Sequence, residues 1–145
     1  MPNAIYSLFE AIGYTHPVHP LLVHISVGTV IGTFLFGIVA LVLKRPVLWT
    51  TARHGVVLSF ICSFFTIFMG IMDSIRAEWW GSTTIKIKLV LSGVLVLLLL
   101  ATILVNRRLP KESPISLIFY TLALANVLAL GFLGAGMVDY TWPIP

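Results

Sequence analysis

The sequence has few charged residues. Five acidic and nine basic residues make up 10% of its 145 positions, whereas a soluble domain carries about 25%. Apolar residues make up 59%, and the mean hydropathy is +1.04. So little polar surface cannot cover a globule in water, which excludes a soluble domain. The composition predicts an integral membrane protein with a single domain over residues 1–145.

Cysteine is nearly absent as well. Cys62 is the single cysteine, so the chain forms no internal disulfide and no cysteine-pair metal or redox motif. It lies inside an apolar run, where a thiol behaves as a small hydrophobe. The sequence also lacks a basic stripe interleaved with aromatic residues, which excludes nucleic-acid binding.

Long apolar runs, in contrast, are abundant. They cover about residues 20–43, 49–72, 85–105 and 115–138. A helix of about 20 apolar residues crosses the hydrocarbon core, and lipid offers no partner to open strand backbone. The links between the first two and the last two runs are short, which predicts antiparallel neighbours. We therefore expect an all-α polytopic membrane protein, an antiparallel four-helix transmembrane bundle in contact with the lipid bilayer.

Two further patterns concern packing. Ile5, Leu8, Phe9 and Ile12 recur at helical spacing before Gly13. This spacing predicts a short N-terminal amphipathic helix in the membrane interface. Small residues recur along the first and second runs: Gly28, Gly32, Ser59, Ser63, Thr66 and Gly70. They predict close approach between helices.

The basic residues are unevenly distributed between the two ends of the runs. Six flank the short links: Lys44, Arg45, Arg53, Arg107, Arg108 and Lys111. Three lie at the opposite ends: Arg76, Lys86 and Lys88. Because cytoplasmic loops carry an excess of Lys and Arg, the first side is predicted to be cytoplasmic. Both termini then face the periplasm of a bacterial inner membrane.

Titratable side chains cluster where the first run begins. The stretch "THPVHPLLVHI", residues 15–25, contains His16, His19 and His24. Pro20 suits a first helical turn, and His24 lies roughly 6 Å deeper along the helix axis. An imidazole inside a membrane span is costly unless it is bonded or coordinated. Zinc is disfavoured because it needs three or four ligands in a tetrahedron, and prolines restrict His16 and His19.

Haem b suits these residues better, since it needs one or two axial ligands, an apolar slot and a polar rim. His24 is the first candidate ligand and His19 the second. On a regular helix they project about 140° apart and cannot flank one iron. Met72 and Met137 lie at a matching depth on other runs. Candidate contacts to propionates or a quinone headgroup are Asp73, Arg76, Lys86, Lys88, Asp139 and Tyr140.

His54 is a second, weaker metal candidate. It begins the second run on the other side of the membrane, roughly 25 Å from His24 by the same helix rise. An interfacial histidine next to Arg53 is the simpler interpretation. The two histidines cannot share one haem within a chain.

The stretch "HPVHPLLVHISVG" resembles the first-helix signature "HPLLVHFPIAL" of a small four-span bacterial membrane family, domain of unknown function 2231. "GIMDSI" and "GFLGAGMVDY" are similar to its second and last helices. The resemblance implies a haem-containing membrane subunit, often adjacent to c-type cytochromes, with His19 and His24 as the matching residues. Members often carry further histidines early in helix three and after the last helix, where this chain reads "TTIKIKLVLSG" and "VDYTWP".

The function expected from these observations is a haem b-binding redox subunit. It would pass electrons near the periplasmic face between quinone and a periplasmic carrier, such as a c-type cytochrome. The alternative is a cofactor-free accessory subunit that stabilises a larger respiratory or photosynthetic membrane complex, with other membrane subunits as partners. A homo-oligomer is compatible with either function. Neither makes the chain itself an enzyme, and a transporter is disfavoured because no broken helix or mid-membrane charge pair is present.

Overall fold

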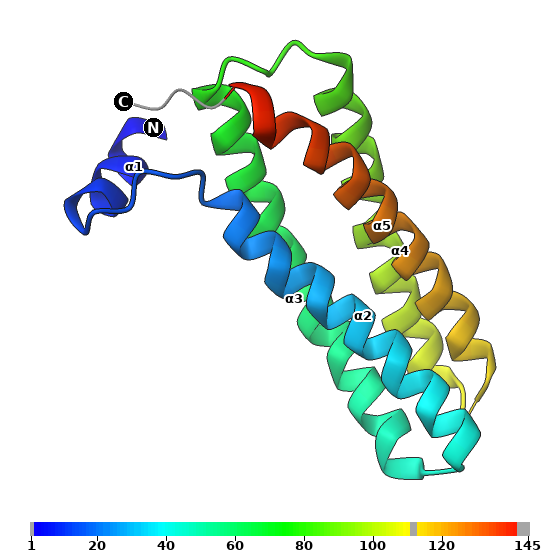
Figure 1. The fold of residues 1–145 in the computed structure, drawn as a ribbon. Helices are drawn as coiled ribbons and strands as arrows, with labels where there is room; N and C mark the ends of the chain where they lie inside the picture. The colour runs from blue at the N-terminus through cyan, green and yellow to red at the C-terminus, as the bar shows by residue number, and fades with distance from the viewer. Residues whose placement is uncertain (1, 111–112, 142–145) are drawn as a thin grey trace.

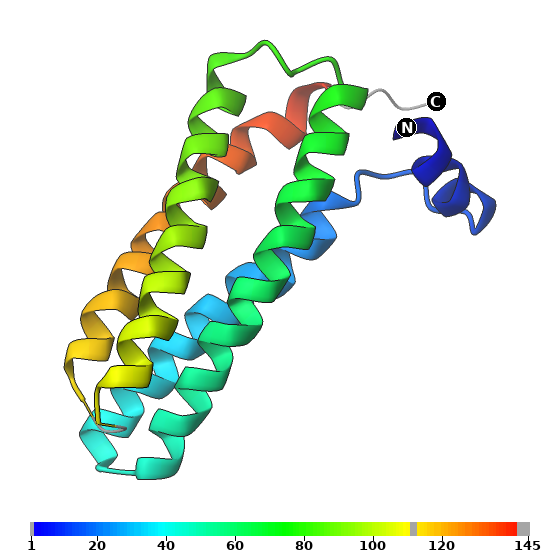
Figure 2. The same ribbon diagram turned by 180° about the vertical axis from the view of Figure 1, so that it is seen from behind.

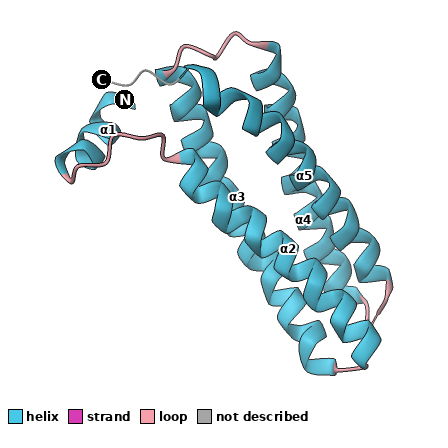
Figure 3. Cartoon of the chain, viewed as in Figure 1, coloured by secondary structure: helices cyan, strands magenta, loops and turns pink. Residues whose placement is uncertain are grey.

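The computed structural model describes residues 2–110 and 113–141, and side chains for residues 5–110 and 113–135. Within these residues the chain forms five helices and no strand (Figure 1). The helices are α1 (Pro2–Ala11), α2 (His19–Leu43), α3 (Pro46–Arg76), α4 (Thr83–Arg108) and α5 (Ile115–Thr141). Short loops join them, as Figure 3 shows.

Helices α2 to α5 form the antiparallel four-helix bundle that the sequence predicted. Each has a segment long and apolar enough to cross a membrane: His19–Leu43, Pro46–Arg76, Thr83–Arg108 and Ile115–Ala135. Each helix packs against the next along the chain, and α5 packs back against α2, which closes the ring (Figures 1 and 2). At 31 residues, α3 is about 46 Å long and extends beyond the hydrocarbon core.

The helix boundaries follow local sequence signals. A proline stands in the first turn of both α2 and α3. Proline is tolerated there because the N–H groups of a first turn have no acceptor within the helix. Lys44 ends α2 in the left-handed conformation, with φ 50°. Only Lys44 and Arg45 separate α2 from α3, so these two helices must run antiparallel. The hydroxyl of Ser82 accepts a hydrogen bond from the Ile85 N–H at 3.3 Å and caps α4.

The predicted N-terminal helix is confirmed as α1, which packs against α3. Tyr6 is buried, and the Arg76 guanidinium lies 4.3 Å from the centroid of its ring. Arg76 also forms an ion pair with Glu10 at 2.7 Å. Leu8 and Ile12 remain 72% and 78% exposed. Leu8 lies on α1 and Ile12 directly follows it, so both give this segment an exposed apolar side, and its location in the membrane interface stays a prediction.

The α2–α3 interface holds some of the small residues that the sequence singled out, but not all of them. Ser59 donates a hydrogen bond to the Thr29 hydroxyl at 3.0 Å. In contrast, a Cβ atom added at Gly28 or Gly32 would meet no described atom within 4 Å. The expectation that these two glycines mark a close helix approach is therefore wrong within this chain, because they face away from its interior.

The two ends of the bundle differ. We call the end that carries Arg53, Asn106 and Tyr120 the closed end, and the end that carries His19, Asp73 and Lys88 the open end. At the closed end, Arg53 donates hydrogen bonds to the carbonyls of Asn106, Leu109 and Pro110 at 2.6, 3.2 and 2.6 Å. A compact apolar core continues from there toward mid-bundle. The cavities described next lie at the open end.

Candidate functional site

His19 is held against α3 by two hydrogen bonds. Its backbone N–H donates to the Asp73 carboxylate (Oδ2) at 2.9 Å, and its ring Nδ1 lies 2.9 Å from the Thr66 carbonyl oxygen. Because a carbonyl only accepts, we assign the ring hydrogen to Nδ1. The other ring nitrogen, Nε2, then has a free lone pair. The imidazole is therefore oriented as a metal ligand or a hydrogen-bond acceptor.

Gly70 provides the space for this ring. A Cβ atom at position 70 would lie 2.9 Å from both Cε1 and Nδ1 of His19, so any other residue would push the imidazole away. Thr66 and Gly70 are four residues apart and share one face of α3. In the sequence both residues indicate only close helix packing, with no predicted part in the site. The signal that could have identified them is their i, i+4 spacing on α3.

His19 lines a cavity of about 370 Å³ between α2, α3, α4 and α5. Its walls are mostly apolar, and Val27, Leu95 and Val127 lie at its inner end. Leu95 is seven residues from Lys88 on α4, which makes the cavity about 10 Å deep at 1.5 Å per residue. This is the size and character of a small-molecule site, which typically occupies about 300–1,000 Å³.

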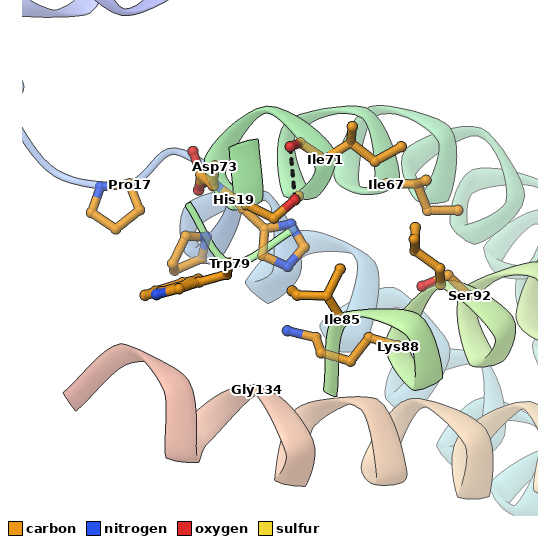
Figure 4. Close-up of a pocket in the computed structure, with 14 residues that line it drawn as sticks. Pro17, His19, Ile67, Ile71, Asp73, Trp79, Ile85, Lys88, Ser92 and Gly134 are labelled. Atoms are coloured by element: carbon orange, nitrogen blue, oxygen red, sulfur yellow. Dashed lines mark hydrogen bonds between the residues drawn. The ribbon is translucent and has the colours of Figure 1, made fainter. Parts of the chain in front are cut away.

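A smaller cavity of about 80 Å³ adjoins the larger one toward the end of the bundle. His19, Lys88 and Ser92 line both cavities, whereas Asp73 and Trp79 line only the smaller one. Figure 4 shows the ammonium end of the Lys88 side chain across this space from the His19 ring, on the side of Gly134. The two compartments therefore meet at a histidine from α2 and a lysine from α4.

His24 lines the larger cavity from its exposed rim. Its Nδ1 lies 2.6 Å from the Pro20 carbonyl oxygen, which again leaves Nε2 with a free lone pair. His16 is exposed and contacts the edge of Tyr14. His54 is exposed at the closed end. The structure thus brings His19 and His24 to one cavity and leaves His16 and His54 outside it.

Of the other predicted site residues, some line the cavities and others do not. Asp73 and Lys88 line the cavities, whereas Arg76 pairs with Glu10 of α1. Three residues line neither cavity: Met72, Arg76 and the exposed Lys86. Met137, Asp139 and Tyr140 lie outside the residues whose side chains are described. Within the described part of the chain, no group of three or more His, Cys, Asp or Glu side chains is placed to hold a metal ion.

Comparison with known families gives one match. The chain matches the family described as "Predicted membrane protein (DUF2231)" over residues 15–141, and it belongs to that family. No curated protein and no solved structure matches it significantly. Family membership and the four apolar helices together make the chain a multi-pass membrane protein in contact with lipid.

Proposed function

We propose that this member of the family is a redox subunit that binds haem b in the larger cavity. It passes electrons near the periplasmic face between quinone and a periplasmic carrier, such as a c-type cytochrome. One observation supports this proposal above the others. The His19 imidazole is fixed through Nδ1 by the Thr66 carbonyl, and its free Nε2 belongs to a ring that lines an apolar cavity.

The residues present fit such a cofactor. Metal-bound histidines commonly donate their second ring N–H to a backbone carbonyl, which fixes the tautomer, and His19 has this arrangement with Thr66. Histidine is a usual axial ligand of haem. When bound, haem supplies one-electron redox chemistry. The protein positions the imidazole through Thr66 and Asp73, and the apolar walls exclude water.

Among the described residues, His19 is the one that would hold the haem iron. His24 also has a free Nε2, but it projects from the same helix about 140° away. Met72 does not line either cavity. The proposal therefore assigns His19 as the axial ligand and His24 to the rim of the cavity. His54 takes no part, because it lies at the closed end.

The absorbance spectrum of the purified protein tests the cofactor. The full chain is expressed with added haem precursor and purified in a neutral detergent. We expect a Soret band, a pyridine haemochrome of the b type, and a spectral shift when a short-chain quinol is added. A folded protein that stays colourless, even after titration with haemin, would contradict the proposal.

The membrane orientation has its own test. The proposal places both termini in the periplasm of a bacterial inner membrane, because six of nine basic residues flank the links on the opposite side. A reporter that is active only in the cytoplasm and is fused after Pro145 should therefore be silent. The same reporter inserted between Lys44 and Arg45 should be active. The reverse pattern would move the cavity to the cytoplasmic face.

The second candidate is a cofactor-free accessory subunit, and one observation favours it. Gly28 and Gly32 leave a flat strip on α2 that meets no described atom of this chain. Such strips are where membrane helices from other chains pack closely. In this case the protein would be colourless and would be purified together with other membrane subunits. Gly28→Leu would then reduce that association.

A further inference from the structure

Lys88 is a positive charge inside a membrane-spanning helix. It lies in the second turn of α4, is half-buried, and lines both cavities. Among the residues whose side chains are described, Lys88 forms no ion pair or hydrogen bond. A charged side chain inside a membrane span is unfavourable unless it meets an opposite charge or a polar partner. The environment of Lys88 therefore favours an anion in the cavity.

Ser92 adds a second donor beside it. Lys88 and Ser92 are one helical turn apart on the same face of α4, and both line both cavities. The Ser92 hydroxyl has no hydrogen-bond partner among the described residues. An ammonium and a hydroxyl side by side match the two acceptor oxygens of a carboxylate. Asp73 lines only the smaller cavity, so an anion in the larger cavity stays apart from it.

The larger cavity opens toward the lipid-facing surface between α2 and α5. Three of its lining residues are exposed: His24 of α2 and Gly131 and Ala135 of α5. Gly131 has no neighbouring atom within 4 Å of an added Cβ among the described residues, so no described side chain closes the cavity there. Because this surface faces hydrocarbon, a molecule that enters by this route must have an apolar body.

We propose that Lys88 and Ser92 anchor a carboxylate carried by an apolar molecule that enters from the bilayer between α2 and α5. The body of the molecule occupies the apolar part of the larger cavity, and the carboxylate lies at the end where α4 begins. Two sources share this chemistry: a propionate of haem and the carboxyl group of a fatty acid. The identification of the carboxylate as a haem propionate rests on the proposed function. The binding of a carboxylate by Lys88 and Ser92 does not.

The experiment compares matched ligands that differ only in charge. The full-length protein in dodecyl maltoside is titrated with haemin, haemin dimethyl ester, oleate and oleyl alcohol. Binding is followed by the Soret band for the haems and by tryptophan fluorescence for the others, since Trp79 lines the smaller cavity. The variants are Lys88→Met and Ser92→Ala, and Lys86→Met is the control because Lys86 is exposed on the same helix and lines neither cavity.

We expect Lys88→Met to weaken binding of at least one acid by about 10- to 100-fold, the value of one hydrogen bond to a charged group. Ser92→Ala should weaken it by about 3- to 10-fold, because a neutral donor contributes less. The ester and the alcohol should change by less than about twofold in either variant. Lys86→Met should bind all four ligands like the parent chain.

The outcomes separate this inference from the proposed function. Lys88-dependent binding of oleate without any haemin binding keeps the anchor and overturns the haem proposal. Haemin and oleate binding that are both equal in the parent and Lys88→Met keep the haem proposal and overturn the anchor. Binding of neither acid to the folded parent chain, or equal losses for charged and neutral ligands, also overturns the anchor. If Lys88→Met does not fold, Ser92→Ala and Lys88→Arg decide, with Lys88→Arg expected to retain acid binding.

Discussion

At the closed end of the bundle, Arg53 donates three hydrogen bonds to backbone carbonyls, whereas at the open end Lys88 has no acceptor among the described side chains. Asn106 at the closed end and His19 at the open end show the same contrast. The Asn106 side-chain amide donates a hydrogen bond to the Tyr120 hydroxyl at 3.2 Å and accepts one from the Ser116 hydroxyl at 2.7 Å. His19 makes its bonds through the backbone and Nδ1 and leaves Nε2 free.

The difference indicates two uses of polar side chains in a membrane bundle. The Asn106 carbonyl lies in the last turn of α4 and has no intrahelical donor. The Leu109 and Pro110 carbonyls directly follow the helix, and a guanidinium there also interacts favourably with the negative end of the helix dipole. Arg53 therefore stabilises the fold. At the open end, polar groups are positioned by packing but keep free atoms that face a cavity, which is the arrangement of a binding site. Substitutions at the two ends should accordingly affect different measurements.

The largest effect on stability is expected for Arg53→Met. Loss of its three hydrogen bonds leaves carbonyls at the end of α4 without their charged donor, which should lower the free energy of unfolding by about 2–4 kcal/mol. Ligand binding by the remaining folded protein should be unchanged. Equilibrium unfolding in mixed micelles measures the free energy of unfolding, and haemin titration measures ligand binding. Arg108→Met is the control, because Arg108 is exposed at the same end. Equal stability of the two variants would contradict the role given to Arg53.

Asn106→Leu should have the next largest effect. Asn106 is 6% exposed, and its removal takes one hydrogen bond from each of the Ser116 and Tyr120 hydroxyls, at a cost of about 1–3 kcal/mol. Asn126→Leu provides the comparison, because Asn126 is also buried and its Oδ1 has no hydrogen-bond partner in the described part of the chain. It should be neutral or stabilising. A larger loss at Asn126 than at Asn106 in the same unfolding assay would contradict this account of the closed end.

The smallest effect on stability is expected for Gly70→Ala. Its Cβ would lie 2.9 Å from the His19 ring, and the strain of overpacking is partly offset by the higher helix propensity of alanine, leaving a loss of about 1 kcal/mol. Ligand affinity should fall more clearly, because the imidazole must move. Gly93→Ala is the matched control, since an added Cβ there meets no described atom within 4 Å. Unchanged haemin binding in Gly70→Ala would show that haemin affinity does not depend on the position of the His19 ring.

Much of the fold could be predicted from the sequence. Four apolar runs, the prolines at helix starts and the short links determine the number of helices and their antiparallel order. The exact length of α3 could not, because the polar residues Asp73, Ser74 and Arg76 of its last turn resemble a loop in composition. Its last turn is ordered by contacts from α1, where Arg76 meets Tyr6 and Glu10. Contacts between residues so far apart in sequence leave no periodic signal.

Less of the candidate site could be predicted from the sequence. The clustering of His19 and His24 pointed to the end of the bundle where the cavities lie, but not to their different burial or to the carbonyl of Thr66 that orients His19. Arg76, Lys86 and Lys88 looked equivalent as cationic residues on one side of the membrane. Their roles differ because Arg76 reaches α1, Lys86 points outward and Lys88 points into a cavity. Such distinctions depend on the rotation of each helix about its axis.

The haem-to-protein ratio of single histidine variants shows whether His19 at the open end holds the haem. His19→Ala should lose most of the bound haem, and added imidazole should restore it, because the substitution leaves a space that imidazole fits. His24→Ala should retain part of the haem with a changed spectrum, since His24 lies at the rim of the same cavity. His54→Ala should retain all of it, with thermal melts confirming that each variant is folded. Full haem retention in His19→Ala, together with loss in His54→Ala, would place the cofactor at the closed end and contradict the account.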